Sequence, residues 1–237
     1  MAGQVFAYIS HKGGKADDTA QELLVAAGRM FPDAAPTAIV TGNGPELDAV
    51  CSEVAGHYQE VWKFGHEALA YPNAEAIRKL LVDVLPGDAV VLIPHDTFGM
   101  DLGPGLSIKL DSVFVSDVAG IDGLDGDTLK VTRQEYSGQV STHLSCDISA
   151  GAVINVRPGV FQAEESGSAA GGQVVDKSAE IGDLTVGRRY LEVVEAEVGD
   201  VDITKEDVLV SVGRGIEDED NIEIADELAE AMGAVVS

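Results

Sequence analysis

Short apolar runs alternate with longer amphipathic segments through the first half of the chain, and this order is typical of parallel strands linked by helices. The clearest apolar run is "DAVVLIP", residues 88–94, and such a run is expected for a strand buried on both faces of a sheet. Residues 16–30 carry acidic side chains at their start and apolar side chains at helical spacing, which predicts a helix. The predicted strands of this half are 4–10, 37–42, 60–65 and 88–94, and its predicted helices are 16–30, 45–55 and 73–85.

A short helix and another strand are predicted within residues 103–121. Two β-rich runs then follow in residues 126–146, separated by Tyr136, Ser137 and Gly138. A turn-like connection between two such runs predicts an antiparallel hairpin added to the sheet.

One more apolar strand is predicted in residues 151–161. Residues 162–183 are rich in Gly, Ser and acidic side chains, so they are expected to cross the surface as an extended segment. Residues 188–207 are predicted to contain a further strand and a short acidic connector.

The chain is strongly acidic, with 41 acidic and 15 basic residues and a formal charge of −26. This charge repels phosphate backbones and anionic lipid headgroups, so neither nucleic acid nor a membrane is expected as a partner. The N-terminus enters strand-like sequence directly and no apolar run is long enough to span a membrane, which predicts a soluble, cytoplasmic protein. Cys51 and Cys146 lack metal-ligand spacing and are interpreted as small buried residues.

Residues 208–237 have the pattern of a strand, a glycine turn and an amphipathic helix that leads into another apolar run. The turn, Gly213–Arg214–Gly215, has the context in which backbone N–H groups and a helix N-terminus receive the anionic part of a ligand. The full dinucleotide fingerprint of three spaced glycines is absent, so an ordinary turn is the alternative. Residues 217–220 are all acidic and oppose a phosphate there, so any cofactor contact is expected through Arg214. In the alternative, Arg214 pairs with an acidic side chain of the following turn.

His95 and Asp96 follow an apolar strand at the carboxyl edge of the predicted sheet, where open α/β sheets place their sites. A catalytic dyad and a polar loop both remain open for this pair, and no nucleophile with a local signature accompanies it. Residues 11–15, "HKGGK", lack the ending of a phosphate loop and are predicted to be a connector. No metal site is predicted, because no ligand-like spacing is found among His11, His57, His66 and His143.

Four segments, in order, resemble the α subunit of the electron transfer flavoproteins. The most specific is "TFGMDLGPGLSIKL", residues 97–110, which is similar to the family's Thr-x-x-Gly-Arg-Asp-Leu-Ala-Pro-Arg-Leu-Ala segment. "VTRQEYSGQVST", residues 131–142, resembles the family's Arg-Pro-x-x-Gly-Gly-Asn turn. "VRPGVF", residues 156–161, and "VLVSVGRGI", residues 208–216, complete the order.

Three positions depart from the family pattern. Met100 and Gly105 replace two arginines of the first segment, and Gln134 replaces the proline that follows Arg133. The loss of two cations puts in doubt any contact that the family makes through them. The apolar pattern persists, so the implied fold is unaffected.

The resemblance implies an α/β protein in two parts. Residues 1–200 are expected to form the family's N-terminal domain, a largely parallel sheet flanked by helices of the adenine nucleotide alpha hydrolase-like type, with the added antiparallel hairpin. Residues 201–237 are expected to be a connector and the incomplete beginning of a second, Rossmann-like FAD-binding domain. Family members continue into the rest of that domain, so we expect either a native chain that extends past Ser237 or a shortened paralogue.

The resemblance also implies FAD as the cofactor, bound in part by Gly213, Arg214 and Gly215. In the family, the arginine matching Arg214 lies against the flavin, and most other contacts are expected beyond Ser237 and on a β subunit. That β subunit holds AMP or, in electron-bifurcating members, a second FAD.

The implied function is that of an electron carrier without catalytic residues of its own. As the α subunit of a heterodimer, the chain is expected to relay electrons through FAD between a dehydrogenase, such as an acyl-CoA dehydrogenase, and a redox acceptor. The main alternative is an FAD-free scaffold or docking subunit in a larger redox complex. A nucleotide-binding hydrolase of similar α/β architecture is a third reading, based on fold analogy alone.

Overall fold

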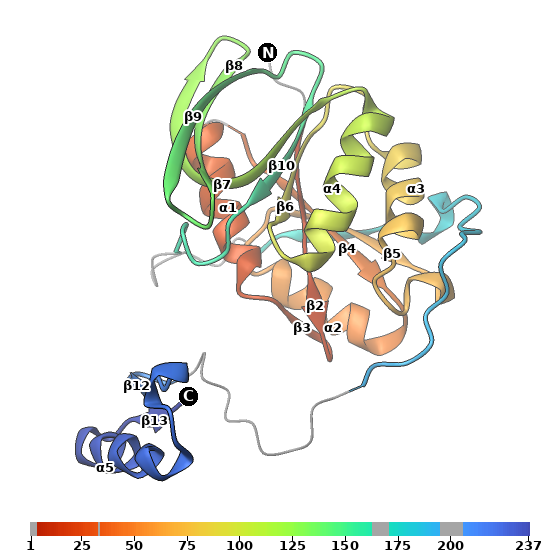
Figure 1. Cartoon of the computed structure of the whole chain (residues 1–237). Coiled ribbons are helices and arrows are strands. Elements are labelled where there is room, and N and C mark those ends of the chain that lie inside the picture. Colours follow the sequence, from red (N-terminus) through yellow and green to blue (C-terminus); the bar gives the residue numbers. More distant parts are fainter. Residues whose placement is uncertain (1–3, 33, 163–170, 195–205) are drawn as a thin grey trace. The chain divides into compact units, whose positions relative to one another are not determined.

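A computed structural model of the chain describes residues 4–32, 34–162, 171–194 and 206–237 (Figure 1). The chain divides into two compact units, Met1–Tyr190 and Leu191–Ser237. The domain boundary predicted at residue 200 falls outside the described residues and stays a prediction.

The first unit is built on a nine-stranded sheet with the strand order β11-β5-β4-β1-β6-β10-β7-β8-β9. The first seven strands in this order are parallel, and β8 and β9 extend the sheet as an antiparallel hairpin. The parallel strands are β1 (Val5–Tyr8), β4 (Thr37–Gly42), β5 (Glu60–Gly65), β6 (Val90–Pro94), β7 (Val113–Asp125), β10 (Ala152–Val156) and β11 (Gln173–Asp176). The hairpin strands are β8 (Thr128–Glu135) and β9 (Val140–Asp147).

Two pairs of helices cover the two faces of this sheet (Figure 1). One apolar cluster contains the buried sides of α1 (Thr19–Met30) and α2 (Gly44–Val54), and the other those of α3 (Ala74–Val84) and α4 (Thr97–Leu110). Strand β6 contributes alternate residues to both clusters and all five of its residues are buried. The predicted parallel α/β sheet with an added hairpin is therefore confirmed.

The hairpin turns where the sequence predicts it, because Tyr136, Ser137 and Gly138 all have left-handed backbone, with φ of 51°, 56° and 83°. The helix expected within residues 103–121 is longer than predicted and begins at Thr97. Residues 11–15 are more ordered than a simple connector, because β2 (His11–Lys12) and β3 (Lys15–Ala16) pair antiparallel around Gly13 and Gly14.

The segment predicted to cross the surface contains an additional strand. Gln173–Asp176 pairs in parallel with β5 at the edge of the sheet, whereas residues 163–170 lie outside the description. The strand predicted in 188–207 is absent from the described residues 188–194 and 206–207, and its other positions lie outside them.

The C-terminal unit is a strand–helix–strand arrangement. Strands β12 (Leu209–Val210) and β13 (Val235–Val236) pair in parallel, and α5 (Ile222–Met232) connects them. Backbone hydrogen bonds extend the pairing beyond the two strands, with the N–H of Val212 2.8 Å from the carbonyl of Ser237.

Across the described residues, no helix has the length and apolar character needed to cross a membrane. Cys51 is buried as expected, whereas Cys146 is only half-buried against the core, and both are free thiols.

Candidate functional site

The predicted turn Gly213–Arg214–Gly215 follows β12 and forms a 3₁₀ turn, Arg214–Ile216, in which the N–H of Ile216 donates to the carbonyl of Gly213 at 3.0 Å. A Cβ atom built at either glycine would have no heavy atom within 4 Å. Neither glycine has left-handed backbone; the residue with a positive φ is Glu217, at 67°. The glycines therefore leave open space at the turn instead of supplying the φ angle that bends it.

Arg214 carries an exposed side chain that has no ion pair or hydrogen bond within the part of the chain that the structure describes. The alternative pairing with Glu217 or Asp218 is not formed there. The N–H of Glu217 bonds to the backbone carbonyl of Arg214 at 3.3 Å, and the carboxylate of Asp218 accepts from the N–H of Asp220 at 3.3 Å. The guanidinium of Arg214 is thus available to a ligand.

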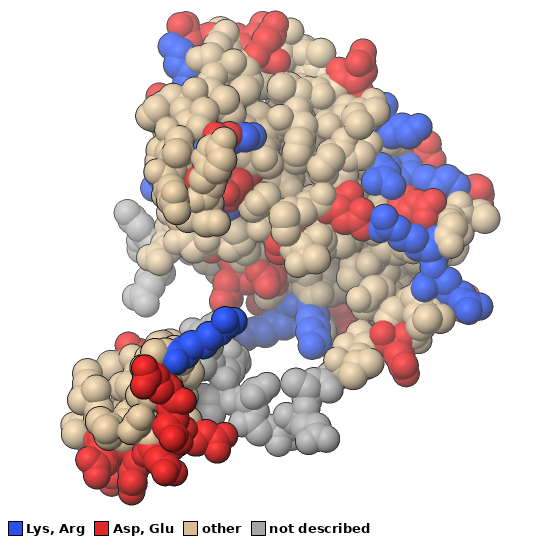
Figure 2. All heavy atoms as spheres, in the orientation of Figure 1, with Lys and Arg blue, Asp and Glu red and all other residues tan. Residues whose placement is uncertain are grey.

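Charge makes Arg214 distinctive in the C-terminal unit. It is the one basic residue in 206–237, a stretch with ten acidic residues. Figure 2 shows acidic side chains over much of this unit. A single cation among many anions gives an electron-rich group one favourable place to bind.

An open groove of about 400 Å³ lies beside the turn. Strand β12, the turn and the apolar side of α5 form it, so a flat apolar ring fits its walls better than a phosphate does. Its lining residues are Val210, Ser211, Val212, Gly213, Gly215, Ile216, Ile224, Ala225 and Leu228.

The N-terminus of α5 does not lie at this turn, which corrects the context expected from the sequence. Helix α5 begins only at Ile222, after a second 3₁₀ turn, Glu219–Asn221. The acidic residues 217–220 therefore stand between the glycines and the helix, and the helix N-terminus adds no attraction for an anion at the turn. The open glycines, the groove and the free Arg214 together fit part of a flavin.

The structure does not bring His95 and Asp96 together as a dyad. The carboxylate of Asp96 caps α4 by accepting from the N–H of Gly99 at 2.6 Å. His95 Nε2 instead lies 3.8 Å from Oδ1 of Asp117, a residue of β7. Asp96 is therefore a helix cap, and the polar-loop interpretation describes it better.

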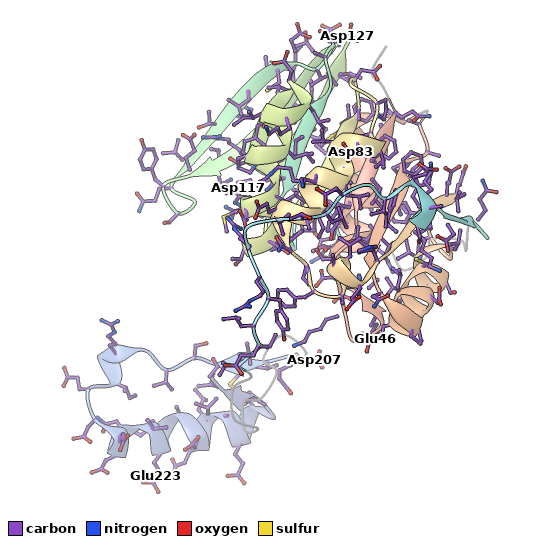
Figure 3. The ribbon with its side chains drawn as sticks, turned by 90° about the vertical axis from the view of Figure 1, so that its right-hand side faces the viewer. Glu46, Asp83, Asp117, Asp127, Asp207 and Glu223 are labelled. Atoms are coloured by element: carbon purple, nitrogen blue, oxygen red, sulfur yellow. The ribbon has the colours of Figure 1, made fainter. Side chains whose placement is uncertain are left out.

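A polar cluster around Asp117 was not found by sequence reasoning. Strand β7 has an irregular register opposite β10 at this point, and Asp117 has left-handed backbone, with φ of 58°. Arg157 donates to both carboxylate oxygens of Asp117, at 2.8 and 2.6 Å, and these bonds lower the pKa of Asp117. Figure 3 labels Asp117. Buried side-chain atoms without a partner in the described structure are His95 Nδ1 and both amide atoms of Asn155.

The described residues contain no group of three His, Cys, Asp or Glu side chains placed to hold a metal ion. The described cluster of His95, Asp117, Arg157 and Asn155 contains no Ser, Thr, Cys or Lys side chain that could act as a nucleophile, and the carboxylate of Asp117 is paired with Arg157.

The fold and the turn define a protein class in which an α/β unit precedes a strand–turn–helix that fits part of a nucleotide cofactor. Each of these two parts of the chain matches a known protein-family domain. Residues 5–181 match the electron transfer flavoprotein domain, and residues 202–237 match the electron transfer flavoprotein FAD-binding domain. The chain belongs to the electron transfer flavoprotein α family.

Individual relatives agree with this assignment. The chain is 26% identical over 200 residues to the electron transfer flavoprotein subunit alpha of Megasphaera elsdenii, covering 81% of this chain and 59% of that protein. It is 25% identical to the acryloyl-CoA reductase electron transfer subunit beta of Anaerotignum propionicum, covering 97% of this chain and 71% of that protein. The chain thus spans little more than half the length of the Megasphaera protein.

Proposed function

We propose that this chain is the α subunit of a heterodimeric electron transfer flavoprotein. FAD would supply the chemistry by accepting electrons from a dehydrogenase and passing them to an acceptor. The match of both parts of the chain to the two domains of one family, in the family's order, supports this function best. A cytoplasmic location, consistent with the composition, belongs to the same proposal.

The residues of this chain have distinct roles in the proposal. The open backbone at Gly213 and Gly215 admits the edge of the flavin, and the apolar groove excludes water from one side of it. Arg214 then holds a positive charge beside the ring, which stabilises the reduced, electron-rich form and raises the reduction potential.

The partners are proposed on the same basis. A β subunit would complete the flavin site and hold AMP or a second FAD. The electron donor would be a dehydrogenase, for example one that acts on acyl-CoA. The name of the Anaerotignum propionicum relative, an acryloyl-CoA reductase electron transfer subunit, supports a redox partner that acts on a CoA thioester. The first unit supplies the folded surface on which such partners assemble.

The test is to purify the complete protein with its β subunit and to measure its flavin absorbance near 450 nm together with the intact mass of each subunit. We expect Arg214→Ala to weaken FAD binding about five- to tenfold, which corresponds to about 1 to 1.4 kcal/mol for the loss of one contact, and to lower the reduction potential. Arg214→Lys should recover part of the effect. Arg189→Ala, which removes an exposed arginine of the first unit, is the matched control.

A flavin-free wild-type complex of correct mass would reject this function and support the FAD-free docking subunit instead. An Arg214→Ala protein with unchanged flavin content and an unchanged potential would reject the role of Arg214 alone.

A further inference from the structure

Residues 171–190 run across the first unit as one continuous segment, here called the strap (Figure 3). We propose that the strap is clamped along its length and thereby sets how much chain is available to link the two units, with Glu75 and Arg188 as the positioning residues at its end. Its importance for electron transfer rests on the proposed function, because the linked C-terminal unit is the part that would hold the flavin.

The strap is fixed at its start by close backbone packing. The N–H of Gly172 donates to the carbonyl of Ala55 at 2.8 Å, and a Cβ at Gly172 would lie only 1.8 Å from the carbonyl oxygen of Tyr58. Strand β11 follows directly, and Lys63 of β5 bridges to Asp176 at 3.1 Å. Only glycine fits at position 172, so the backbone at the start of the strap is held close to that of Tyr58.

The middle of the strap is held by a side chain every few residues. Ser178 Oγ accepts from the N–H of Gly65 at 2.8 Å, and Lys79 Nζ donates to the carbonyl of Thr185 at 2.7 Å. Leu184 is buried in the apolar cluster that α3 and α4 share. These contacts combine apolar burial with satisfied polar groups, which is what keeps an extended segment in place.

The end of the strap is bound to the first turn of α3. The carboxylate of Glu75 accepts from the backbone N–H groups of Gly187 and Arg188, both at 3.1 Å, and these bonds lower its pKa. The amide of Asn73 donates to the carbonyl of Arg188 at 3.2 Å, while the guanidinium of Arg188 pairs with Asp101 of α4. The positive end of α3 favours the charged Glu75 at this position.

The clamp stops at an aromatic pair. Tyr190 stacks on Tyr71 with ring centroids 4.2 Å apart. Beyond it Leu191 and Val194 are 74% and 86% exposed, and the division between the two units falls between Tyr190 and Leu191. The last fixed point of the first unit is therefore Tyr190.

The position of this point limits the reach of the C-terminal unit. From Tyr190 to the start of β12 the chain can span at most about 60 Å, whereas a link starting at Phe161 could span about 160 Å. The clamp thus shortens the longest link that the chain between the two units can make.

The test uses the complete protein with its β subunit. Glu75→Ala removes the acceptor that holds the end of the strap, and Glu67→Ala, at an exposed glutamate just before α3, is the matched control. Amide hydrogen exchange is measured on residues 185–190. Distances between a spin label on the first unit and one on the C-terminal unit are measured by double electron–electron resonance, after Cys51 and Cys146 have been replaced.

We expect Glu75→Ala to raise exchange at the amides of Gly187 and Arg188 at least tenfold and to extend the distance distribution to longer values, and Glu67→Ala to change neither. Faster exchange with an unchanged distance distribution would overturn the proposal, and so would unchanged exchange. If Glu75→Ala does not fold, Arg188→Ala must give the same two changes. Flavin content is measured in the same samples, so that the proposed function and the role of the strap are tested separately. A flavin-free wild-type protein would reject the proposed function, whereas the exchange and distance measurements would still test the strap.

Discussion

Helices α3 and α5 are both amphipathic, but their apolar faces are covered to very different extents. Helix α3 packs into the apolar cluster on one face of the sheet and buries Ala74, Ala76, Ile77, Leu80 and Leu81. Helix α5 buries only Ala225 and Ala229, while Ile224, Leu228 and Met232 stay exposed. Periodicity therefore identifies the apolar face of a helix, and the surrounding elements decide whether that face is covered.

The sheets repeat this contrast. Strand β10 has a neighbour on each side and helices over both faces, and all five of its residues are buried. Strands β12 and β13 have only each other, and one helix cannot shield both faces of a two-stranded sheet. The first unit holds its own core, whereas the described C-terminal unit presents apolar surface that a flavin or further protein can cover.

The largest expected effect compares two leucines on equivalent helix faces. Leu80 of α3 is 1% exposed and Leu228 of α5 is 50% exposed. Leu80→Ala should lower the free energy of unfolding by about 2–5 kcal/mol, because it leaves a cavity, whereas Leu228→Ala should change it by less than about 0.5 kcal/mol. Urea unfolding of the 237-residue chain without flavin, carrying either substitution, checks this. Equal losses would remove the contrast between the two units.

Two glycines give the next comparison. A Cβ at Gly172 meets the carbonyl of Tyr58, whereas a Cβ at Gly213 meets nothing within 4 Å. Gly172→Ala should cost about 1–3 kcal/mol of stability and increase exchange in β11, because backbone must move to admit the methyl group. Gly213→Ala should leave stability unchanged. A Gly172→Ala protein with wild-type stability and β11 protection would show that the strap entry adapts freely.

The smallest effect is expected from acid. Hydrogen bonds from the hydroxyl and N–H of Ser178, together with Lys63, lower the pKa of Asp176 to about 2. Hydrogen bonds from the hydroxyl and N–H of Thr185, together with Lys79, lower the pKa of Asp183 to about 2. Unfolded carboxyl groups titrate near about 4, so this stabilisation is present above about pH 4 and is lost as pH falls to about 2. The strap should loosen in that window.

The fluorescence of Trp62, the single tryptophan, reports the change, because Lys177 Nζ lies 4.3 Å from the centre of its ring. We expect a fluorescence change between about pH 4 and pH 2, with smaller amplitude in Asp176→Asn. A fluorescence signal that stays constant through this range, or that changes only with global unfolding, would contradict the predicted loosening of the strap.

The sequence predicted the elements whose determinants are local. The apolar run of β6 and the Tyr136–Gly138 turn carry their own signals, and both were found as predicted. Strand β11 was missed because it is short, mostly exposed and paired with β5, far away in the chain. The early start of α4 is harder to predict, because an Asp that follows a strand at the edge of a sheet can be either a site residue or a helix cap, and Asp96 is a cap.

The same distinction holds at the sites. The location of the Gly213–Arg214–Gly215 turn after a strand followed from local pattern, whereas the left-handed Glu217 and the second 3₁₀ turn did not. The Asp117–Arg157 pair joins residues forty positions apart through an irregular strand register. No spacing rule in a single sequence signals such a contact.

The most direct test of the contrast between the two units is amide hydrogen exchange of the complete protein, measured with and without bound flavin. We predict slow exchange in β1, β6 and β10 in both states, and fast exchange in residues 208–237 that slows at least tenfold when flavin binds. Residues 208–237 as protected without flavin as β6, or unchanged by its binding, would contradict the view that one unit is self-sufficient and the other is completed by its cofactor.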